Sequence, residues 1–283
     1  GTDFTDSFSI EKEASCQSFI KQNMQVGKIY GDIENVRIVD LDGVDVFAAG
    51  FPCQPFSTAG KRNGSADQRG QMFKYCREYV DTHTPKMFLV ENVSALMKDK
   101  KFKKTFDYYM RRLCSAGDDG YEVHVKVINT REHGLPQNRE RVYWVGFRKS
   151  AIPRKSAAFA WPAPTEPLPL ENILDMDNEG HTGNLSTTVR RNLKKALIHL
   201  ADAESDDEDV IYMLDVFSGH KGVKLMKNVC PCITTARGSG GGFWIINLNR
   251  LTTVRELLML QGFPSSVRRA GISDHKLGMM VVP

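Results

Sequence analysis

The sequence predicts an α/β protein with a doubly wound sheet and a second, smaller module. Three observations support this prediction. Apolar strand patterns alternate with helical patterns through the first half of the chain, as in sheets whose strands are joined by crossover helices. Reactive side chains directly follow several of these strands, at the edge where such folds keep functional groups. A proline-rich stretch at 151–169 then separates this region from a polar region of different composition.

The composition is that of an ordinary soluble globular chain: 283 residues, 41% hydrophobic, 25% charged, with a formal net charge of +4. This charge is compatible with a polyanionic partner but does not establish one. The six cysteines form no CxxC pair, so we expect no disulfide framework and no metal site, in a reducing, intracellular setting. No apolar run is long enough to span a membrane, and no secretory signal pattern opens the chain.

The first element is a short strand pattern at 7–10, followed by a helical pattern over 11–23. Glu11 follows the strand directly, which is where doubly wound folds hold the ribose hydroxyls of nucleotides. An acid that stabilises the N-terminus of the next helix is an equally good interpretation. A second acid, Asp32, lies in the turn Tyr30-Gly31-Asp32-Ile33, which is weak support because Gly-Asp turns are common.

The next strand pattern, 44–49, runs into a proline-flanked turn, Gly50-Phe51-Pro52-Cys53-Gln54-Pro55-Phe56-Ser57. A turn at this point delivers Cys53 to the carboxyl edge of the sheet, so Cys53 is a candidate nucleophile. The alternative for a lone cysteine is a small buried hydrophobic residue. The polar loop that follows, 57–70, has the length of an active-site lid or binding loop.

A helical pattern over 71–83 leads to a third strand pattern, 87–90, and Glu91-Asn92 follows it directly. A crossover of this length brings Glu91 and Cys53 to the same edge of the sheet. A solvated surface acid is the alternative for Glu91 taken alone.

Further on, a helix is predicted over 102–113 and strands over 121–127 and 142–147. Arg139 and Arg141 lie at the entry of the last strand, and their spacing predicts that both guanidinium groups face one side. A solvated charge run is the usual explanation of such a pair, and a phosphate or base contact is the more specific one.

After the proline-rich boundary, the polar region contains one predicted helix and an acidic run that we expect to face away from any nucleic acid. It ends in a flexible loop with a basic tip, and a capped helix follows, stopped by Gly262 and Pro264. These segments are the helix 193–201, the acidic run 202–209, the loop 234–242 and the helix 254–261. We therefore predict three regions: a catalytic domain at 1–160, a target-recognition region at 161–246, and a return to the catalytic domain at 247–283.

Four motifs, in order along the chain, resemble those of the DNA (cytosine-5) methyltransferase family. They are Gly50-Phe51-Pro52-Cys53-Gln54-Pro55-Phe56-Ser57; Glu91-Asn92-Val93; Gln137-Asn138-Arg139-Glu140-Arg141; and Arg250-Leu251-Thr252-Thr253-Val254-Arg255-Glu256 with Leu260-Gln261-Gly262-Phe263-Pro264. The resemblance extends from Ser7 to Pro283 once a variable region is allowed. It implies a Rossmann-like sheet of the S-adenosylmethionine-dependent methyltransferases with a small mixed target-recognition domain.

The chemistry of this family explains the residue types. Carbon 5 of cytosine is too weak a nucleophile to take a methyl group from a sulfonium unless a thiolate first adds to carbon 6. The resemblance assigns that attack to Cys53, with Pro52 beside it in the site. It assigns to Glu91 the acid that hydrogen-bonds or protonates ring nitrogen 3 and the exocyclic amine, which requires burial that raises the pKa of this carboxyl. Asn92 then holds the cysteine loop.

The same resemblance implies double-stranded DNA as partner, because the target carbon is reached only when its nucleotide is flipped out of the stack, at a cost of a few kcal/mol. Arg141 is expected to contact the flipped base and its backbone, with Arg139 in support, and the loop 57–70 to close over it. The nucleic-acid-binding candidates are Gln54, Ser57, Arg69, Gln137, Arg141, Thr234 and Arg237. We expect a monomer, in the nucleus of a eukaryote or the cytoplasm of a bacterium.

For the cofactor, the resemblance implies S-adenosylmethionine, with S-adenosylhomocysteine as product. Glu11 corresponds to the acid at its ribose, and Asp32 and Ile33 to the pair at its adenine, with Pro52 also in this site. Family members begin with a glycine-rich strand and turn that this sequence lacks, and Met279 follows Gly278 where the family has asparagine. Both departures affect the cofactor site, so we expect weak binding of S-adenosylhomocysteine in a calorimetric titration.

Two alternatives of function and one of topology stay open at this point. A tRNA cytosine-5 methyltransferase is one, although the Cys-Phe-Thr signature of that branch is absent. A catalytically silent nucleic-acid-binding relative is the other. The stretch 214–222 imitates the missing glycine-rich turn and raises a circular permutation, which would require it to pair beside the strand at 7–10.

Overall fold

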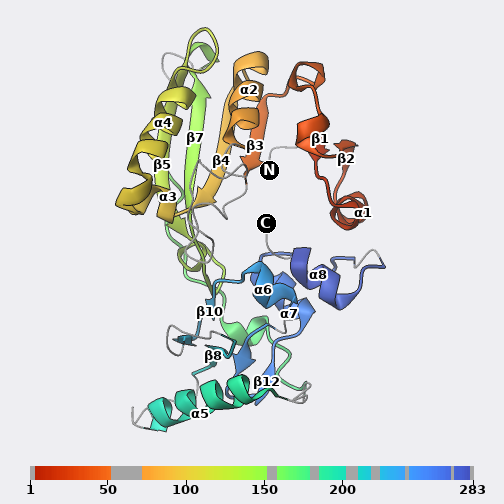
Figure 1. Ribbon diagram of the computed structural model, residues 1–283, viewed down its shortest axis with the longest axis vertical. Helices are drawn as coiled ribbons and strands as arrows, with labels where there is room; N and C mark the ends of the chain where they lie inside the picture. Colours follow the sequence, from red (N-terminus) through yellow and green to blue (C-terminus); the bar gives the residue numbers. More distant parts are fainter. Residues whose placement is uncertain are drawn as a thin grey trace. The chain divides into compact units, whose positions relative to one another are not determined.

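The structure, a computed structural model, describes residues 4–51, 72–151, 158–178, 185–201, 210–217, 224–239, 242–268 and 271–280. The chain forms two compact units, whose elements are labelled in Figure 1. Unit 1 comprises Gly1–Ile128 and Glu140–Pro162, and unit 2 comprises Asn129–Arg139 and Ala163–Pro283. The predicted roles of 161–246 and 247–283 are not tested by this division and stay predictions.

Unit 1 contains a four-stranded sheet in the order β3-β4-β7-β5 and a separate parallel pair, β1-β2. Its helices lie between the strands along the chain, as the alternating pattern predicts. Its strands are β1 (Asp6–Ile10), β2 (Val26–Tyr30), β3 (Val46–Gly50), β4 (Met87–Val93), β5 (Tyr121–Asn129) and β7 (Glu140–Arg148). Its helices are α1 (Ala14–Asn23), α2 (Phe73–His83), α3 (Ala95–Lys98) and α4 (Lys103–Cys114).

The direction of the strands decides which residues meet at the functional edge of the sheet. β3 and β4 are parallel, with Gly50 opposite Glu91. β7 runs antiparallel to β4, with Val93 opposite Arg141. The end of β4 therefore lies beside the beginning of β7, and residues from both motifs reach the same edge.

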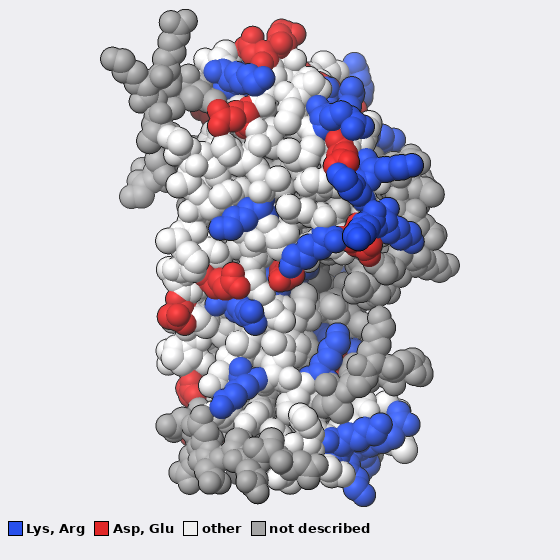
Figure 2. Space-filling model, turned by 90° about the vertical axis from the view of Figure 1, so that its left-hand side faces the viewer, with Lys and Arg blue, Asp and Glu red and all other residues white. Residues whose placement is uncertain are grey.

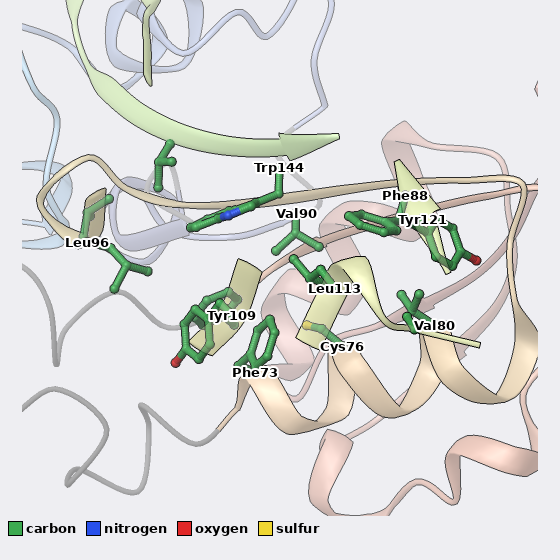
Figure 3. Close-up of a cluster of buried hydrophobic side chains, with 14 of the residues drawn as sticks. Phe73, Cys76, Val80, Phe88, Val90, Leu96, Tyr109, Leu113, Tyr121 and Trp144 are labelled. Carbon is green, nitrogen blue, oxygen red and sulfur yellow. The ribbon is translucent and has the colours of Figure 1, made fainter. Parts of the chain in front are cut away.

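The core of unit 1 is built from the apolar faces of α2 and α4 against β4 and β7 (Figure 3). Phe73 of α2 stacks on Tyr109 of α4 with ring centroids 3.8 Å apart. Stacked pairs of this kind contribute about 0.5–1.5 kcal/mol beyond their burial. Cys76 is buried in the same cluster, and burial raises the pKa of its thiol to about 12, so this cysteine is a packing residue.

A close approach between β4 and β7 depends on a glycine. Gly146 lies opposite Phe88 in the antiparallel register, and Phe88 is fully buried. A Cβ atom at position 146 would overlap the Phe88 ring. Only glycine leaves room there for the ring to cross over the neighbouring strand.

The pair β1-β2 packs on the rest of unit 1 through aromatic side chains. The Tyr79 ring of α2 stacks on the Phe47 ring of β3, with ring centroids 4.3 Å apart, and packs against the Phe8 ring of β1, with centroids 5.7 Å apart. Because β1 and β2 are parallel, with Ile10 opposite Tyr30, their carboxyl ends lie side by side. The residues that follow them, Glu11 and the Gly31-Asp32 turn, are therefore neighbours.

Unit 2 contains a four-stranded sheet in the order β12-β11-β8-β9 and a short parallel pair, β6 with β10. Its strands are β6 (Gln137–Asn138), β8 (Tyr212–Asp215), β9 (Lys224–Lys227), β10 (Cys230–Pro231), β11 (Trp244–Ile245) and β12 (Arg250–Leu251). Its helices are α5 (Thr187–Ala201), α6 (Thr235–Ser239), α7 (Val254–Leu260) and α8 (Asp274–Met280). The partners of β8 are β9 and β11, and β1 pairs with β2, so the strand pairing argues against the circular permutation.

Most elements predicted within the described residues are present, with three differences. The helix predicted over 193–201 begins six residues earlier, at Thr187. The third strand continues through Glu91 and Asn92 to Val93, because β7 extends the ladder past the point where the apolar run ends. The segment predicted as a flexible loop at 234–242 contains α6, whose first turn is closed by hydrogen bonds to the Thr234 carbonyl. The predicted lid at 57–70 and acidic run at 202–209 lie outside the described residues. Among described residues, no helix is both long and apolar enough to cross a membrane.

Candidate active site

The central feature of the site is an ion pair at the edge of the unit 1 sheet. Arg141 Nε lies 2.8 Å from Glu91 Oε1, and the two side chains are 11% and 26% exposed. Arg141 also donates from Nη1 to the Glu140 carbonyl oxygen at 2.8 Å. A charge-assisted contact of this length fixes the orientation of both groups. The carboxylate is thus partly buried, positioned, and still open to one side.

Gly50 keeps that side of the carboxylate clear. It lies opposite Glu91 in the β3-β4 register, and a Cβ atom there would lie 3.3 Å from Glu91 Oε2. Any side chain at this position would therefore crowd the Glu91 carboxylate. The sequence assigns no role to Gly50 beyond its place in the motif, because its pairing with Glu91 between two strands is visible only in the folded structure.

Asn92 ties the start of the cysteine turn to β4. Its side chain is fully buried, donates from Nδ2 to the Phe51 carbonyl oxygen at 3.1 Å and accepts from the Val93 N–H at 2.9 Å. The Phe51 ring is held edge-on against Phe73 and Tyr109. Both the backbone and the side chain of Phe51 are thus fixed immediately before the turn. The predicted residues of the turn and of the loop after it lie outside the described residues: Pro52, Cys53, Gln54, Ser57 and Arg69.

Two acids lie at the carboxyl ends of the parallel pair β1-β2. Glu11 accepts the Glu13 N–H at Oε1, at 2.8 Å, and Asp32 accepts the Glu34 N–H at Oδ1, at 3.0 Å. Each of these bonds orients a carboxylate and uses one of its oxygens. The Gly31 turn between them has open space where a side chain would lie. The remaining carboxylate oxygens are hydrogen-bond acceptors, which fit a ligand that donates from vicinal hydroxyls and an exocyclic amine, such as an adenosine.

The arginines predicted to act together belong to different units. Arg141 is in unit 1, whereas Arg139 is in unit 2, where it is 7% exposed and its carbonyl accepts the Thr130 N–H at 3.0 Å. The prediction that both guanidinium groups face one side rested on a single continuous strand. The structure instead ends β6 at Asn138 and begins β7 at Glu140, so the alternation of a single strand does not apply across Arg139.

The buried side chain of Gln137 forms hydrogen bonds to three other residues of unit 2. Its side chain is fully buried, donating to the Leu260 carbonyl oxygen at 2.9 Å and to Gln261 Oε1 at 3.0 Å. Its own Oε1 accepts the Ile233 N–H at 3.3 Å. The amide is engaged within unit 2, which disfavours the predicted contact with nucleic acid.

The basic residue predicted at the tip of the loop 234–242, Arg237, lies in α6 and is also engaged. Arg237 forms an ion pair with Asp215, Nε to Oδ1 at 2.6 Å, and its guanidinium lies 5.5 Å from the centre of the Phe217 ring. Thr234 is exposed, and its carbonyl accepts from the backbone of Arg237 and Gly238. A DNA contact by Thr234 stays a prediction, while one by Arg237 would compete with the Asp215 pair.

Comparison with solved structures places the fold. The S. pombe Dnmt2 methyltransferase superposes with a TM-score of 0.61 at 15% identity, covering 99% of this chain and 85% of that one. The Entamoeba histolytica methyltransferase EhMeth superposes with a TM-score of 0.56 at 14% identity, covering 98% and 93%. The fold is therefore that of the Rossmann-like methyltransferases, as the sequence predicts.

Comparison with sequences gives the family. The protein-family model for "C-5 cytosine-specific DNA methylase" matches residues 1–277 of this chain. Type II methyltransferase M.NgoBI of Neisseria gonorrhoeae is 34% identical over 262 residues, which cover 92% of this chain and 76% of that protein. Type II methyltransferase M.HaeII of Haemophilus aegyptius is 34% identical over 263 residues, covering 92% and 75%. The chain belongs to the C-5 cytosine-specific DNA methylase family, so its activity is that of a DNA (cytosine-5) methyltransferase. The match starts at residue 1 and does not confirm the predicted loss of an N-terminal motif.

Proposed function

We propose that this chain methylates carbon 5 of cytosine in double-stranded DNA through a transient covalent bond from Cys53 to carbon 6. The observation that supports it best is the arrangement around Phe51. Asn92 fixes the residue two positions before Cys53, and the same strand presents Glu91, oriented by Arg141, at the same sheet edge. A nucleophile and a carboxyl group delivered to one place are what addition to a pyrimidine ring requires.

In the proposed reaction, the Cys53 thiolate forms a bond to carbon 6, and the electron pair of the carbon 5–carbon 6 double bond moves onto carbon 5. Glu91 stabilises the charge that develops on the ring by donating to nitrogen 3 or accepting from the exocyclic amine. Carbon 5 takes the methyl group, a base removes its proton, and the thiolate leaves as the double bond re-forms. The flipped base is held by Arg141, whose Nε already contacts the carboxylate.

The methyl donor for this step is S-adenosylmethionine, which supplies an electrophilic methyl group and leaves as S-adenosylhomocysteine. Glu11 is the residue we assign to its ribose hydroxyls, and Asp32 and Ile33 to its adenine, with Pro52 alongside. The carboxylates are oriented for this by their bonds to the Glu13 and Glu34 N–H groups. DNA as substrate also places the activity inside the cell.

Mechanism-based trapping tests the proposal. A duplex that carries 5-fluorocytosine cannot lose a proton from carbon 5, so the thiolate cannot leave and the adduct persists. We expect a covalent protein–DNA adduct that depends on S-adenosylmethionine and is lost in Cys53→Ser. Cys114→Ser is the matched control, since Cys114 is a half-buried free cysteine of α4, and it should form the adduct as the parent does.

Three results would contradict the proposal in different ways. Reversible binding of the duplex without an adduct would favour the silent relative. An adduct that forms on tRNA and not on duplex DNA would favour the RNA-directed alternative. An adduct that survives Cys53→Ser would show that another group attacks the ring.

A further inference from the structure

A dense basic segment follows the Glu91 strand and has no role in the site described above. Between residues 98 and 104, five of seven side chains are lysines: Lys98, Lys100, Lys101, Lys103 and Lys104. They lie at the end of α3, in the 3-10 turn η5 (Lys100–Phe102) and in the first turn of α4. Two arginines, Arg111 and Arg112, continue the positive charge to the end of α4.

The helix α4 exposes its basic side along its whole length. Its other side is anchored in the core by Tyr109 and Leu113, which are almost fully buried. Lys104 is exposed, Tyr108 is 48% exposed, and both arginines at the end of the helix are exposed. These positions recur at three- and four-residue intervals, so they share one face. Twelve residues of helix span about 18 Å, the length of about five phosphates along one DNA strand at ~3.4 Å each.

Most of the positive charge of this segment is not paired with a carboxylate among the described residues. Lys98 pairs with Glu140 at 2.7 Å, and Lys103 pairs with Asp107 at 2.8 Å. Within the described ranges, no carboxylate pairs with the remaining charged members of the face, Lys100, Lys104, Arg111 and Arg112. Seen from the side on which α4 lies, Lys and Arg side chains gather in a band in the upper half of the view (Figure 2).

The basic segment begins at the sheet edge that carries the candidate active site. Ser94, which follows the Glu91-Asn92-Val93 motif, donates from Oγ to Glu140 Oε2 at 3.4 Å, and Lys98 Nζ reaches the same oxygen. Glu140 is the neighbour of Arg141 in β7. The basic segment therefore begins at the edge of the unit 1 sheet at which β4 ends and β7 begins.

We propose that the exposed basic face of η5 and α4, made by Lys100, Lys101, Lys104, Tyr108, Arg111 and Arg112, binds the phosphate backbone of duplex DNA flanking the target site. The inference rests on the proposed DNA substrate and adds a contact outside the pocket for the flipped base. Lysine and arginine contacts to phosphates carry no sequence information and supply salt-dependent affinity. The Tyr108 hydroxyl, between them, is a further phosphate donor. The surface thus extends the footprint on DNA beyond the recognition sequence.

The salt dependence of DNA binding tests this surface. The variant Lys100→Gln/Lys101→Gln/Lys104→Gln removes three charges and leaves Lys98 and Lys103, which pair with Glu140 and Asp107, in place. On a long duplex, we expect affinity at physiological salt to fall about tenfold, and the slope of log K against log salt to decrease by about one unit per lysine, about three in all. On a short duplex that covers only the target site, the loss should be much smaller.

A matched control carries the same loss of charge elsewhere on unit 1. Lys86, Lys126 and Lys149 are exposed, and they lie before β4, within β5 and after β7. The triple glutamine variant of these residues should keep the parent salt slope. Equal losses in both variants, or no loss in the first, would overturn the proposal.

Two separate measurements distinguish this inference from the proposed function. Adduct formation on 5-fluorocytosine DNA is measured in the parent chain and judges the chemistry alone. The salt slopes are measured on unmodified DNA and judge the surface alone. The parent chain could form no adduct while its slope of log K against log salt on a long duplex still depends on these three lysines. This result would contradict the proposed chemistry and support the proposed DNA-binding surface.

Discussion

Two of the glutamate–arginine pairs among the described residues, Arg250–Glu256 and Arg141–Glu91, differ in burial and in hydrogen bonding. In unit 2, Arg250 and Glu256 are 0% and 2% exposed, and the guanidinium binds both carboxylate oxygens at 3.0 and 2.7 Å. The same two oxygens accept the N–H groups of Thr253 and Asp175. In unit 1, Arg141 Nε lies 2.8 Å from Glu91 Oε1, and Glu91 is 26% exposed.

The difference separates a pair that holds the fold from a pair that we propose to take part in the reaction. A buried carboxylate is stabilised when hydrogen bonds satisfy both of its oxygens. Glu256 meets this condition and also completes the capping box of α7. Burial alone would raise the pKa of Glu256, but hydrogen bonds from Arg250, Thr253 and Asp175 outweigh it and hold the pKa below its ordinary value. Glu91 is oriented but still reachable from solvent, which a group that must contact a substrate requires.

The largest expected effect is on the buried pair. Arg250→Met leaves the Glu256 carboxylate without its partner in a site closed to water, so we expect the free energy of unfolding to fall by about 3–5 kcal/mol, measured by urea denaturation. The double variant Arg250→Met/Glu256→Leu should lose less than Arg250→Met alone. Arg141→Met should cost clearly less stability than Arg250→Met, and an equal cost would break the comparison.

The second effect is on the reactive pair. Glu91→Gln keeps the shape of the side chain but removes the acid, so we expect kcat to fall about 10²–10³-fold with the melting temperature nearly unchanged. Single-turnover methylation of a duplex measures the rate. Glu256→Gln is the control, and we expect the opposite result from it. Its melting temperature should fall, while the folded protein should methylate DNA at the parent rate. A Glu91→Gln enzyme at the parent rate would rule out the assigned role.

Two buried asparagines sharpen the same contrast. Asn92 binds the Phe51 carbonyl oxygen, and Asn192 of α5 binds the Val216 carbonyl oxygen at 2.8 Å. Each Asn→Ala change leaves a buried carbonyl unsatisfied and should cost about 1–3 kcal/mol of stability. Only Asn92→Ala should also slow adduct formation on 5-fluorocytosine DNA. If both variants slow it equally, the anchoring of Phe51 has no special role.

The smallest effect is a pH dependence. The folded pKa of Glu256 lies below its unfolded value of about 4.3, so the ionised carboxylate stabilises the fold above that pH. This contribution is lost as the pH falls through the folded pKa. The stability difference between the parent and Glu256→Gln should therefore narrow below about pH 4. A difference that stays constant down to this range would contradict the assigned shift.

The sequence predicts most of what depends on local pattern and chain order. The strands before Glu11 and Glu91 and the capped helix before Gly262 are present, since apolar periodicity and caps are local signals. The engagement of Gln137 could not be predicted, because its partner Leu260 lies 123 residues away. The α6 helix was missed because glycines usually disfavour helices. The lysines of 98–104 can be read from the sequence, but only the structure shows that Lys98 pairs with Glu140 and Lys103 with Asp107.

The close packing of Phe88 against Gly146 also restricts which residues can be tolerated at position 146 during evolution. Since Phe88 fills the space that any side chain there would need, substitution must either empty the core or push β4 and β7 away from each other. Those strands carry Glu91 and Arg141, so the damage would reach the catalytic edge from a residue that touches no substrate. In a saturation-mutagenesis screen for methylation, position 146 should therefore be among the least tolerant in unit 1, alongside the reactive residues themselves.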